Sequence, residues 1–153
     1  MKIILLLLFF LVSDNLSAQI PSPPGAMQQG KDNSVIFEQV EKEAEFPGGI
    51  KAWISYLENN FKVDSVSEIV WKKLPAKVKR QSGTIKITAI VQFIVCKDGS
   101  LCEIKTINDV PDAFKAEAER LVAESRIWEP AEQNGRKVKA YRKQPITLQI
   151  DVE

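Results

Sequence analysis

Residues 84–107 constrain the fold most strongly, because they combine a strict apolar alternation with a turn signal. The apolar members of the alternation are Ile85, Ile87, Ala89, Val91, Phe93 and Val95. A period of two predicts a strand with one buried face, and two isoleucines on the other face predict that this face is partly covered as well. Asp98 and Gly99 are typical of a tight hairpin turn, so residues 101–107 are predicted to return as the antiparallel partner strand.

A corner and a helix precede this hairpin. The corner is Phe46-Pro47-Gly48-Gly49, in which proline fixes one backbone dihedral and the glycines permit positive φ angles. The apolar residues that follow at helical spacing are Ile50, Trp53, Ile54, Leu57 and Phe61. This spacing predicts an amphipathic helix whose apolar stripe packs in the core. We interpret the corner as a structural element that sets how the helix meets the sheet.

A second helix and a last strand follow the hairpin. Pro111 is predicted in the first turn of the helix, with Asp109 as its cap. The residues that share its apolar face are Phe114, Ala118, Leu121, Val122 and Ser125. Trp128 and Pro130 are interpreted as a plug that packs the end of this helix against the sheet. Residues 137–152 predict the last strand, and Pro145 predicts that it lies at an edge or bends, since proline is confined to edges and bulges.

The order helix, strand, strand, helix, strand predicts the α+β class for residues 35–153. The simplest assembly is a three-stranded antiparallel sheet with two helices packed on one face. A short additional strand is predicted within residues 35–40, ahead of the corner.

The amino-terminal residues predict export. Met1-Lys2 is followed by ten apolar residues, 3–12, which is too short for a bilayer span of roughly 20 residues. With the small pair Ser17-Ala18, this pattern predicts a cleavable signal peptide over residues 1–18. A short uncleaved anchor is the alternative. Residues 19–34, rich in proline and glycine, are predicted to form a flexible leader.

Composition limits the chemistry. The sequence contains no histidine, which excludes histidine-based acid–base catalysis, His-dependent nucleophiles and His metal ligands. A net charge of +1 indicates no general attraction to nucleic acid or anionic lipid. The carboxylates form no recognisable catalytic pair. The sequence therefore predicts no enzyme activity, no cofactor and no metal site.

Cys96 and Cys102 bracket the Asp-Gly turn and are predicted to project from the face opposite the apolar one. Exported proteins can keep disulfides, so a bond across the hairpin is one interpretation, and two free thiols are the other. The spacing differs from the Cys-x-x-Cys of thiol oxidoreductases, so a redox role is not expected.

Residues 63–82 carry a possible short helix that ends before Pro75, and a group of basic side chains. The basic residues are Lys72, Lys73, Lys77, Lys79 and Arg80. They are interpreted either as part of a solvated loop or as a docking patch for an anionic envelope component or an acidic partner segment. Trp71, if exposed, adds a contact residue beside this basic patch.

Three motifs occur in order within residues 36–150. They are the Phe46–Gly49 corner, the run Val-Gln-Phe-Ile-Val-Cys-Lys-Asp-Gly-Ser at 91–100, and Trp-Glu-Pro-Ala-Glu-Gln-Asn-Gly at 128–135. In this order and at this spacing the chain resembles the C-terminal domain of the TonB family, a periplasmic domain that binds outer-membrane transporters. The resemblance implies the α+β fold above and a periplasmic location. It weakens at Leu74-Pro75, where the family usually has Tyr-Pro, and at the additional segment 62–73.

Recognition in this family is by strand addition, in which an extended peptide pairs with an exposed sheet edge. The resemblance implies that the last strand is the receiving edge, and that the partner is the N-terminal segment of an outer-membrane TonB-dependent transporter. The positions it implies are Val138, Ala140, Arg142, Gln144, Thr147 and Gln149. The alternative is that lysines and arginines merely protect this edge against aggregation.

The sequence thus leaves two functional expectations. The first is a peptide-binding module without its own membrane anchor, which competes with a full transducer or works beside an anchored transducer chain. The second is an envelope scaffold that dimerises or holds cell-wall or surface components, and the basic patch favours it slightly. Neither nucleic-acid binding nor membrane insertion after cleavage is expected.

Overall fold

The computed structural model describes residues 28–29, 35–80, 83–125 and 127–152. The predicted signal peptide, residues 1–18, lies outside the described residues, as does the predicted leader apart from residues 28–29. None of the helices described is long and apolar enough to cross a membrane.

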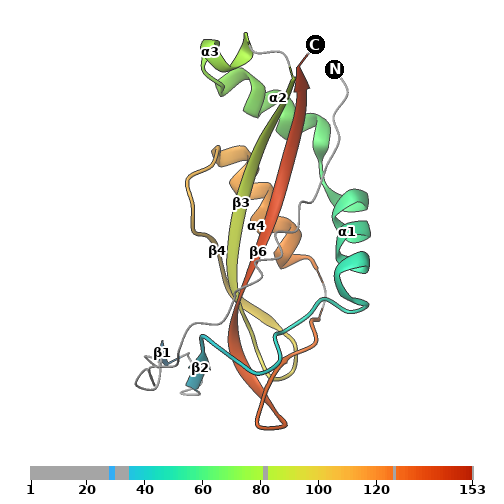
Figure 1. Cartoon of the computed structure of the whole chain (residues 1–153), viewed down its shortest axis with the longest axis vertical. Coiled ribbons are helices and arrows are strands. Elements are labelled where there is room, and N and C mark those ends of the chain that lie inside the picture. Colours follow the sequence, from blue (N-terminus) through green and yellow to red (C-terminus); the bar gives the residue numbers. More distant parts are fainter. Residues whose placement is uncertain (1–27, 30–34, 81–82, 126, 153) are drawn as a thin grey trace, which may run out of the picture.

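The structure is α+β, with one curled sheet and four helices (Figure 1). The strands are β1 (Gln28–Gln29), β2 (Val35–Phe37), β3 (Gly83–Val95), β4 (Leu101–Thr106), β5 (Ala131–Gln133) and β6 (Arg136–Val152). The helices are α1 (Gly49–Asn60), α2 (Val63–Lys73), α3 (Ala76–Lys79) and α4 (Asp112–Ala123).

The sheet is larger and more varied than the predicted three-stranded antiparallel one. Its strand order is β1-β2-β6-β3-β4, with β5 pairing with β6. The antiparallel unit β6-β3-β4 forms one end of this order, and β2 pairs with β6 in parallel, which makes the sheet mixed. The prediction failed here because a strand as short as β2 is held by a partner about a hundred residues away, and local periodicity carries no information about that partner.

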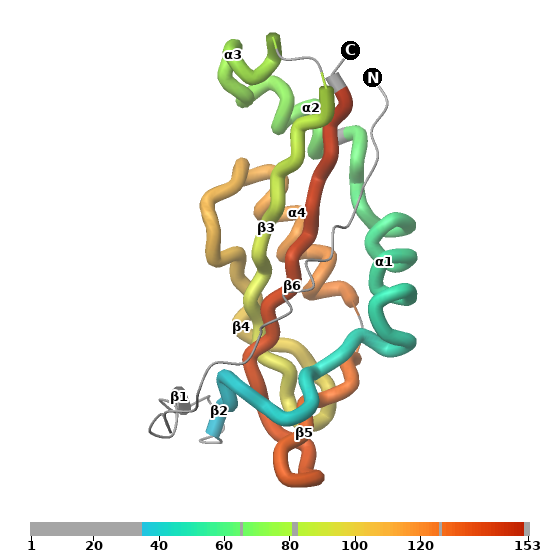
Figure 2. The backbone as a smooth tube through the Cα atoms, viewed as in Figure 1, coloured from blue at the N-terminus to red at the C-terminus, as the bar shows by residue number. Residues whose placement is uncertain are grey.

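The helices outnumber the two of the predicted assembly, and α2 corresponds to the short helix that was considered for residues 63–82 and ends before Pro75. α4 packs across β3 and β4, and α2 packs on α4 (Figure 1). The segment 62–73, which is additional to the TonB pattern, contains the whole of α2 and contributes Val66 and Val70 to the core. α1 lies beside β6, while α2 and α3 lie at the far end of the sheet from β2 and β5 (Figure 2). α1, α2 and α4 all contribute buried side chains to one core cluster with β3 and β6.

An aromatic cluster joins the start of α1 to the end of α4. The Phe46 ring lies 5.2 Å from Trp53 and 5.8 Å from Trp128, centroid to centroid, and Phe93 of β3 lies 5.0 Å from Trp128. The Trp128 indole N–H donates to Ser125 Oγ at 2.9 Å. Trp128 is 2% exposed, so its one polar atom is buried with its hydrogen bond made.

The Asp98-Gly99 turn docks against the same tryptophan. The Trp128 backbone N–H donates to the Gly99 carbonyl at 2.9 Å. Gly99 has a φ of 84°, and a Cβ there would lie 2.1 Å from the Trp128 carbonyl oxygen. Only glycine fits this close approach. Two motifs that are far apart in the sequence therefore meet at one point.

An ion-pair network fixes the far end of α1. Arg120 of α4 donates to the Asn60 carbonyl at 2.8 Å and to Glu117 at 2.7 Å, and Glu117 accepts the Lys62 backbone N–H at 2.8 Å. Burial by itself would raise the pKa of Glu117, but the hydrogen bonds from Arg120 and Lys62 outweigh it and leave that pKa below its ordinary value. The charged form of Glu117 therefore anchors the carboxyl end of α1 to α4.

The start of α4 differs from the prediction. The cap position is Pro111, and its carbonyl accepts the Phe114 N–H at 2.9 Å. No side chain caps the helix, so Asp109 does not play the predicted role. It stands two residues before the cap, whereas a capping side chain must sit at the cap position itself. The predicted apolar face of this helix is confirmed: every residue named for it is buried.

Candidate functional site

β6 has very different neighbours on its two sides. On one side it pairs with all thirteen residues of β3, from Gly83 opposite Val152 to Val95 opposite Ala140. On the other side β2 pairs only with Lys139 and Ala140. Among the residues that the structure describes, no strand lies on that side farther along β6. We call residues 143–151 of β6 the open edge.

The hydrogen bonds of β3 reveal which backbone groups face the open side. The Ile90 N–H donates to Asn108 Oδ1 at 2.7 Å, and the Ile90 carbonyl accepts the Ile107 N–H at 2.9 Å. Both Ile90 groups therefore point toward β4 and away from β6. Along an antiparallel pair, residues that direct their backbone groups toward the partner strand alternate with residues that direct them away from it. The register of β3 and β6 therefore shows which residues of β6 direct their backbone groups away from β3. The β6 residues whose backbone groups point outward are Lys143, Pro145, Thr147, Gln149 and Asp151.

Pro145 is one of these outward-facing residues. It stands opposite Ile90, so the N–H that proline lacks would have pointed to the open side and not to β3. The pairing with β3 consequently loses no donor. This confirms the prediction that the strand lies at an edge around Pro145. Pro145 and the outward-facing residues on either side of it present backbone carbonyls to the open side. Pro145 itself presents no N–H donor there.

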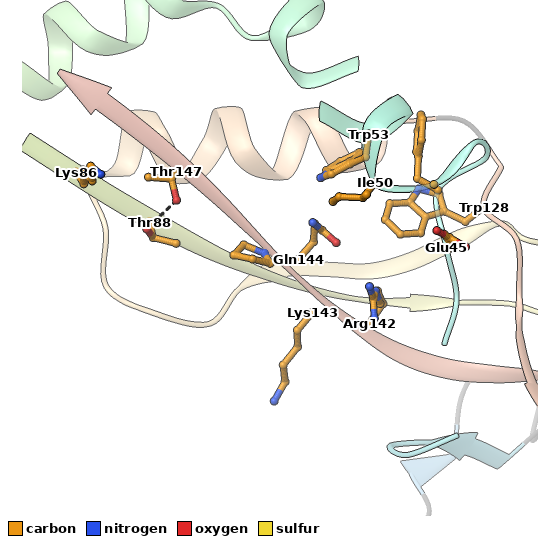
Figure 3. Close-up of a pocket in the computed structure, with 13 residues that line it drawn as sticks. Glu45, Ile50, Trp53, Lys86, Thr88, Trp128, Arg142, Lys143, Gln144 and Thr147 are labelled. Carbon is orange, nitrogen blue, oxygen red and sulfur yellow. Dashed lines mark hydrogen bonds between the residues drawn. The ribbon is translucent and has the colours of Figure 1, made fainter. Parts of the chain in front are cut away.

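A groove of about 680 Å³ runs beside the open edge and reaches α1 (Figure 3). Its lining comes from α1 and the corner before it, from β3 and β6, and from the plug after α4. The lining residues are Glu45, Phe46, Gly49, Ile50, Trp53, Lys86, Thr88, Trp128, Arg142, Lys143, Gln144, Pro145 and Thr147.

The corner before α1 shapes one wall of the groove. Gly48 and Gly49 have φ angles of 86° and 73°, which L side chains rarely adopt. A Cβ on Gly49 would lie 2.9 Å from the Glu45 carboxylate, so the glycine leaves room for that side chain. Ile50, the second residue of α1, is 43% exposed, whereas Trp53 of the same helix is 1% exposed. The wall therefore combines an exposed apolar side chain with a carboxylate.

The charges at the groove are mostly positive. Lys86 and Lys143 are exposed, and Arg142 is joined to Glu43 by an ion pair of 3.2 Å. Glu45 is the acidic side chain among the lining residues. The Nε atom of Arg142 is buried and has no hydrogen-bond partner, although another guanidinium nitrogen contacts Glu43.

The positions implied by the TonB resemblance separate into three groups. Thr147 and Gln149 lie on the open edge with outward-facing backbone groups. Arg142 and Gln144 direct their backbone groups to β3, but both line the groove. Val138 and Ala140 lie where β6 is already paired, with β5 and with β2 and β3 respectively, so they are not part of the open edge.

Sequence reasoning missed several groove residues. Ile50 and Trp53 were assigned to core packing alone, because a helical stripe predicts only which face is apolar. Lys143 and Pro145 were not among the predicted binding positions, although Pro145 predicted that the strand lies at an edge or bends. Side-chain types do not reveal which residues of β6 direct their backbone groups away from β3, so the sequence could not predict these positions.

The predicted basic patch lies on α2, on α3 and at Arg80, which directly follows α3, and none of its five residues lines the groove. Lys72 pairs with Glu68 at 2.7 Å, and Lys73 pairs with Asp112 at 3.7 Å. Lys79 lies over the half-buried Trp71 ring, 5.7 Å from its centroid. These contacts lower the charge available for docking, and Trp71 is partly packed against the core.

The two cysteines lie close together on the hairpin. Their Sγ atoms are 3.7 Å apart and both thiols are free. Cys102 stands opposite Ile94, so Cys96 is its diagonal neighbour. Burial, followed by the hydrogen bond with Cys96, raises the pKa of Cys102 to about 11. Neither cysteine lines the groove, and no group of residues suited to a metal ion occurs within the described part of the chain.

Comparisons with known proteins give no further guidance: no family model, no curated protein and no solved structure matches the chain. The geometry of β6 and its groove is therefore the basis on which a function is assigned.

Proposed function

We propose that this protein is a periplasmic peptide-binding module that receives an extended peptide by strand addition along the open edge of β6. The observation that carries the proposal is the asymmetry of β6, which pairs with β3 along its length but has outward-facing backbone groups along residues 143–151. The groove beside residues 143–147 provides space for a partner.

The physical basis is general. An edge strand presents N–H and C=O groups that an added strand satisfies, so the backbone supplies affinity and the groove side chains supply specificity. The net affinity is modest, because the peptide loses conformational freedom when it becomes ordered. Such binding suits a reversible contact between two components of an envelope.

The convergence of the motifs supports a TonB-like assignment. The Phe46 corner, the Gly99 turn and Trp128 belong to three separate motifs, and they meet in one packed unit at the base of the groove. The unit β4-β3-β6 with α1 and α4 also has the order of helices and strands that the resemblance implies. By the same resemblance, the peptide comes from the N-terminus of an outer-membrane TonB-dependent transporter.

Strand addition can be tested by nuclear magnetic resonance. Isotope-labelled protein comprising residues 19–153 is titrated with peptides from the N-termini of the host's outer-membrane transporters. We expect the largest amide shifts at the outward-facing residues Lys143, Thr147 and Gln149, and smaller ones at Gln144 and Ile146, whose N–H groups face β3.

A matched control separates backbone pairing from side-chain contact. The same peptide, N-methylated at alternate residues, keeps its side chains but loses the donors on one side. One of the two methylation phases should abolish the shifts along the open edge. If none of the transporter peptides shifts these amides, the proposal is wrong.

A further inference from the structure

Two thiols lie in contact outside the groove. The Sγ atoms of Cys96 and Cys102 are 3.7 Å apart, and both side chains are half-buried. Neither residue belongs to the core cluster and neither lines the groove, so the proposed peptide site does not use them. Thiols exchange with disulfides, and a pair of thiols in contact is a candidate site for this chemistry.

The hairpin register brings the two side chains together. The Cys96 backbone N–H donates to the Ser100 carbonyl at 2.9 Å, and Cys102 stands opposite Ile94. Cys96 and Cys102 are therefore diagonal neighbours on paired strands, a separation that cross-strand side chains can bridge. A disulfide requires the two sulfur atoms to approach by roughly 1.6 Å from their present 3.7 Å, which rotation of the side chains can supply.

The surroundings of the pair favour thiol exchange over metal binding. Zinc sites take three or four protein ligands. Among the residues that the structure describes, no group of three or more ligating side chains is suited to a metal ion, so the pair lacks the further ligands that zinc needs. The amino-terminal pattern predicts export, and exported proteins meet disulfide oxidants that cytosolic proteins do not.

The two thiols are not equivalent. Burial is the largest cause that raises the pKa of Cys102 to about 11, followed by the hydrogen bond and the charge of Cys96. Lys139 of β6 lowers this pKa and Glu103 of β4 raises it, so the two nearby charges oppose each other. Since thiolates and not thiols attack disulfides, Cys102 is a poor first nucleophile at neutral pH. Loss of the Cys96 hydrogen bond makes it a better one.

We propose that Cys96 and Cys102 form a redox modification site, at which an external disulfide converts the two thiols to a disulfide across the hairpin. The Cys96 thiolate attacks one sulfur of the external disulfide, forms a mixed disulfide and releases one thiolate. Cys102 then attacks the Cys96 sulfur and releases the second thiolate. The two cysteines lose two electrons, the external disulfide gains them, and the two cysteine protons pass through solvent to the released thiolates. The pair is a substrate of this exchange and not its catalyst, which agrees with a spacing unlike Cys-x-x-Cys.

The disulfide holds a turn that supports the groove. The Gly99 N–H donates to the Cys96 carbonyl, and the Gly99 carbonyl accepts the Trp128 N–H, both at 2.9 Å. Trp128 in turn lines the groove. A bond between Cys96 and Cys102 closes the chain around this turn, so the turn opens away from Trp128 less often. The site thus links the redox state of the surroundings to the order of one groove wall.

Exchange with glutathione tests the chemistry. The reduced protein, residues 19–153, is mixed with buffers of graded ratios of oxidised to reduced glutathione, quenched with acid and analysed by mass spectrometry. We expect a product that has lost two hydrogens and carries no glutathione, because Cys102 resolves the mixed disulfide. A protein that stays in the dithiol form at every ratio, or that collects glutathione on both cysteines, would overturn the proposal.

Two single variants test the order of attack. Cys102→Ser keeps the first nucleophile and should collect one glutathione as a stable mixed disulfide. Cys96→Ser should collect it about tenfold more slowly, because the lower thiolate fraction of Cys102 is only partly offset by the stronger nucleophilicity of a high-pKa thiolate. Equal rates in the two variants would contradict the order of attack.

Hydrogen exchange tests the link to the groove. On oxidation we expect the Trp128 amide to exchange about tenfold more slowly, whereas the Phe61 amide, which donates to Leu57 at the end of α1, should change much less. The double variant Cys96→Ser/Cys102→Ser is the matched control and should show no change in the same buffers. Equal exchange of the Trp128 amide in both redox forms would overturn the link. These readouts need no peptide, so they do not depend on strand addition.

Discussion

The two halves of β6 belong to one continuous strand but have different surroundings. Residues 136–140, the paired half, have strand partners other than β3: residues 136–138 pair with β5, and Lys139 and Ala140 pair with β2. Residues 143–151, the open edge, pair with β3 alone among the described strands. Both halves alternate between the core face and the opposite face. Side-chain alternation therefore determines which face a residue occupies, but not which strand lies beside it.

The halves also differ in how they limit unwanted pairing. Strand neighbours cover the paired half. The open edge instead carries an exposed lysine, Lys143, and a proline without an N–H, Pro145. Charged residues and prolines are common protection for exposed edges. The donors that remain at Lys143, Thr147 and Gln149 are enough for a specific partner whose register avoids the proline.

The largest effect should come from placing a proline at a position of β6 whose N–H faces β3. Gln144→Pro removes the N–H that faces β3 and leaves a buried carbonyl unpaired, so the free energy of unfolding should fall by about 3 kcal/mol. Lys143→Pro removes an outward N–H and should lower it by less than about 1 kcal/mol, while peptide binding is lost. Urea unfolding followed by circular dichroism measures both. If the two variants were destabilised equally, the assignment of which β6 residues direct their N–H groups to β3 would be wrong.

The hairpin that pairs with β6 can be probed through Cys102. Its raised pKa, about 11, keeps the thiol protonated at neutral pH, and the reactive thiolate increases only as the pH approaches that value. Alkylation near neutral pH should therefore be about a hundredfold slower than for an ordinary thiol. Mass spectrometry over a pH series gives the rates. A plateau near pH 9 would contradict the shift, and labelling that requires prior reduction would reveal a disulfide with Cys96.

A smaller effect is expected from restoring the missing donor. Pro145→Ala gives the open edge one more N–H without changing the pairing with β3. One added hydrogen bond, about 0.5–1.5 kcal/mol, should tighten peptide binding by about twofold to tenfold. The variant should also self-associate more readily, which sedimentation velocity can detect. Pro75→Ala, between α2 and α3, is the matched control. Unchanged binding by Pro145→Ala would mean that the partner does not pair along this part of β6.

The smallest effect should come from single exposed charges. Lys143→Ala should weaken binding of an acidic peptide by less than about 1 kcal/mol, and the difference should shrink at high salt. Lys77→Ala, in the basic patch on α3, should have no effect on the same peptide. Calorimetric titrations at two salt concentrations make the comparison. If Lys77→Ala lowered the affinity for the peptide more than Lys143→Ala, the result would favour the scaffold interpretation, in which the basic patch is the docking surface.

Much of the architecture could be predicted because it depends on local signals. The alternation before Val95, the Asp98-Gly99 turn and the stripe that contains Trp53 each correspond to an element of the structure. The cap of α4 was wrong because Asp109 lies outside the position where a cap acts. The short strands β2 and β5 give weak local patterns, so the mixed character of the sheet was not foreseen.

The sequence by itself determined the faces of the elements, the turns that need glycine, and the place in β6 where a donor is missing. These properties follow from side-chain period and from backbone chemistry within a few residues. The tertiary structure decided which side of β6 remains open, and it placed Trp53 of α1 across the groove from Arg142. Strand neighbours and groove walls are set by contacts between distant segments, and such contacts depend on how the whole chain packs, which no local pattern encodes.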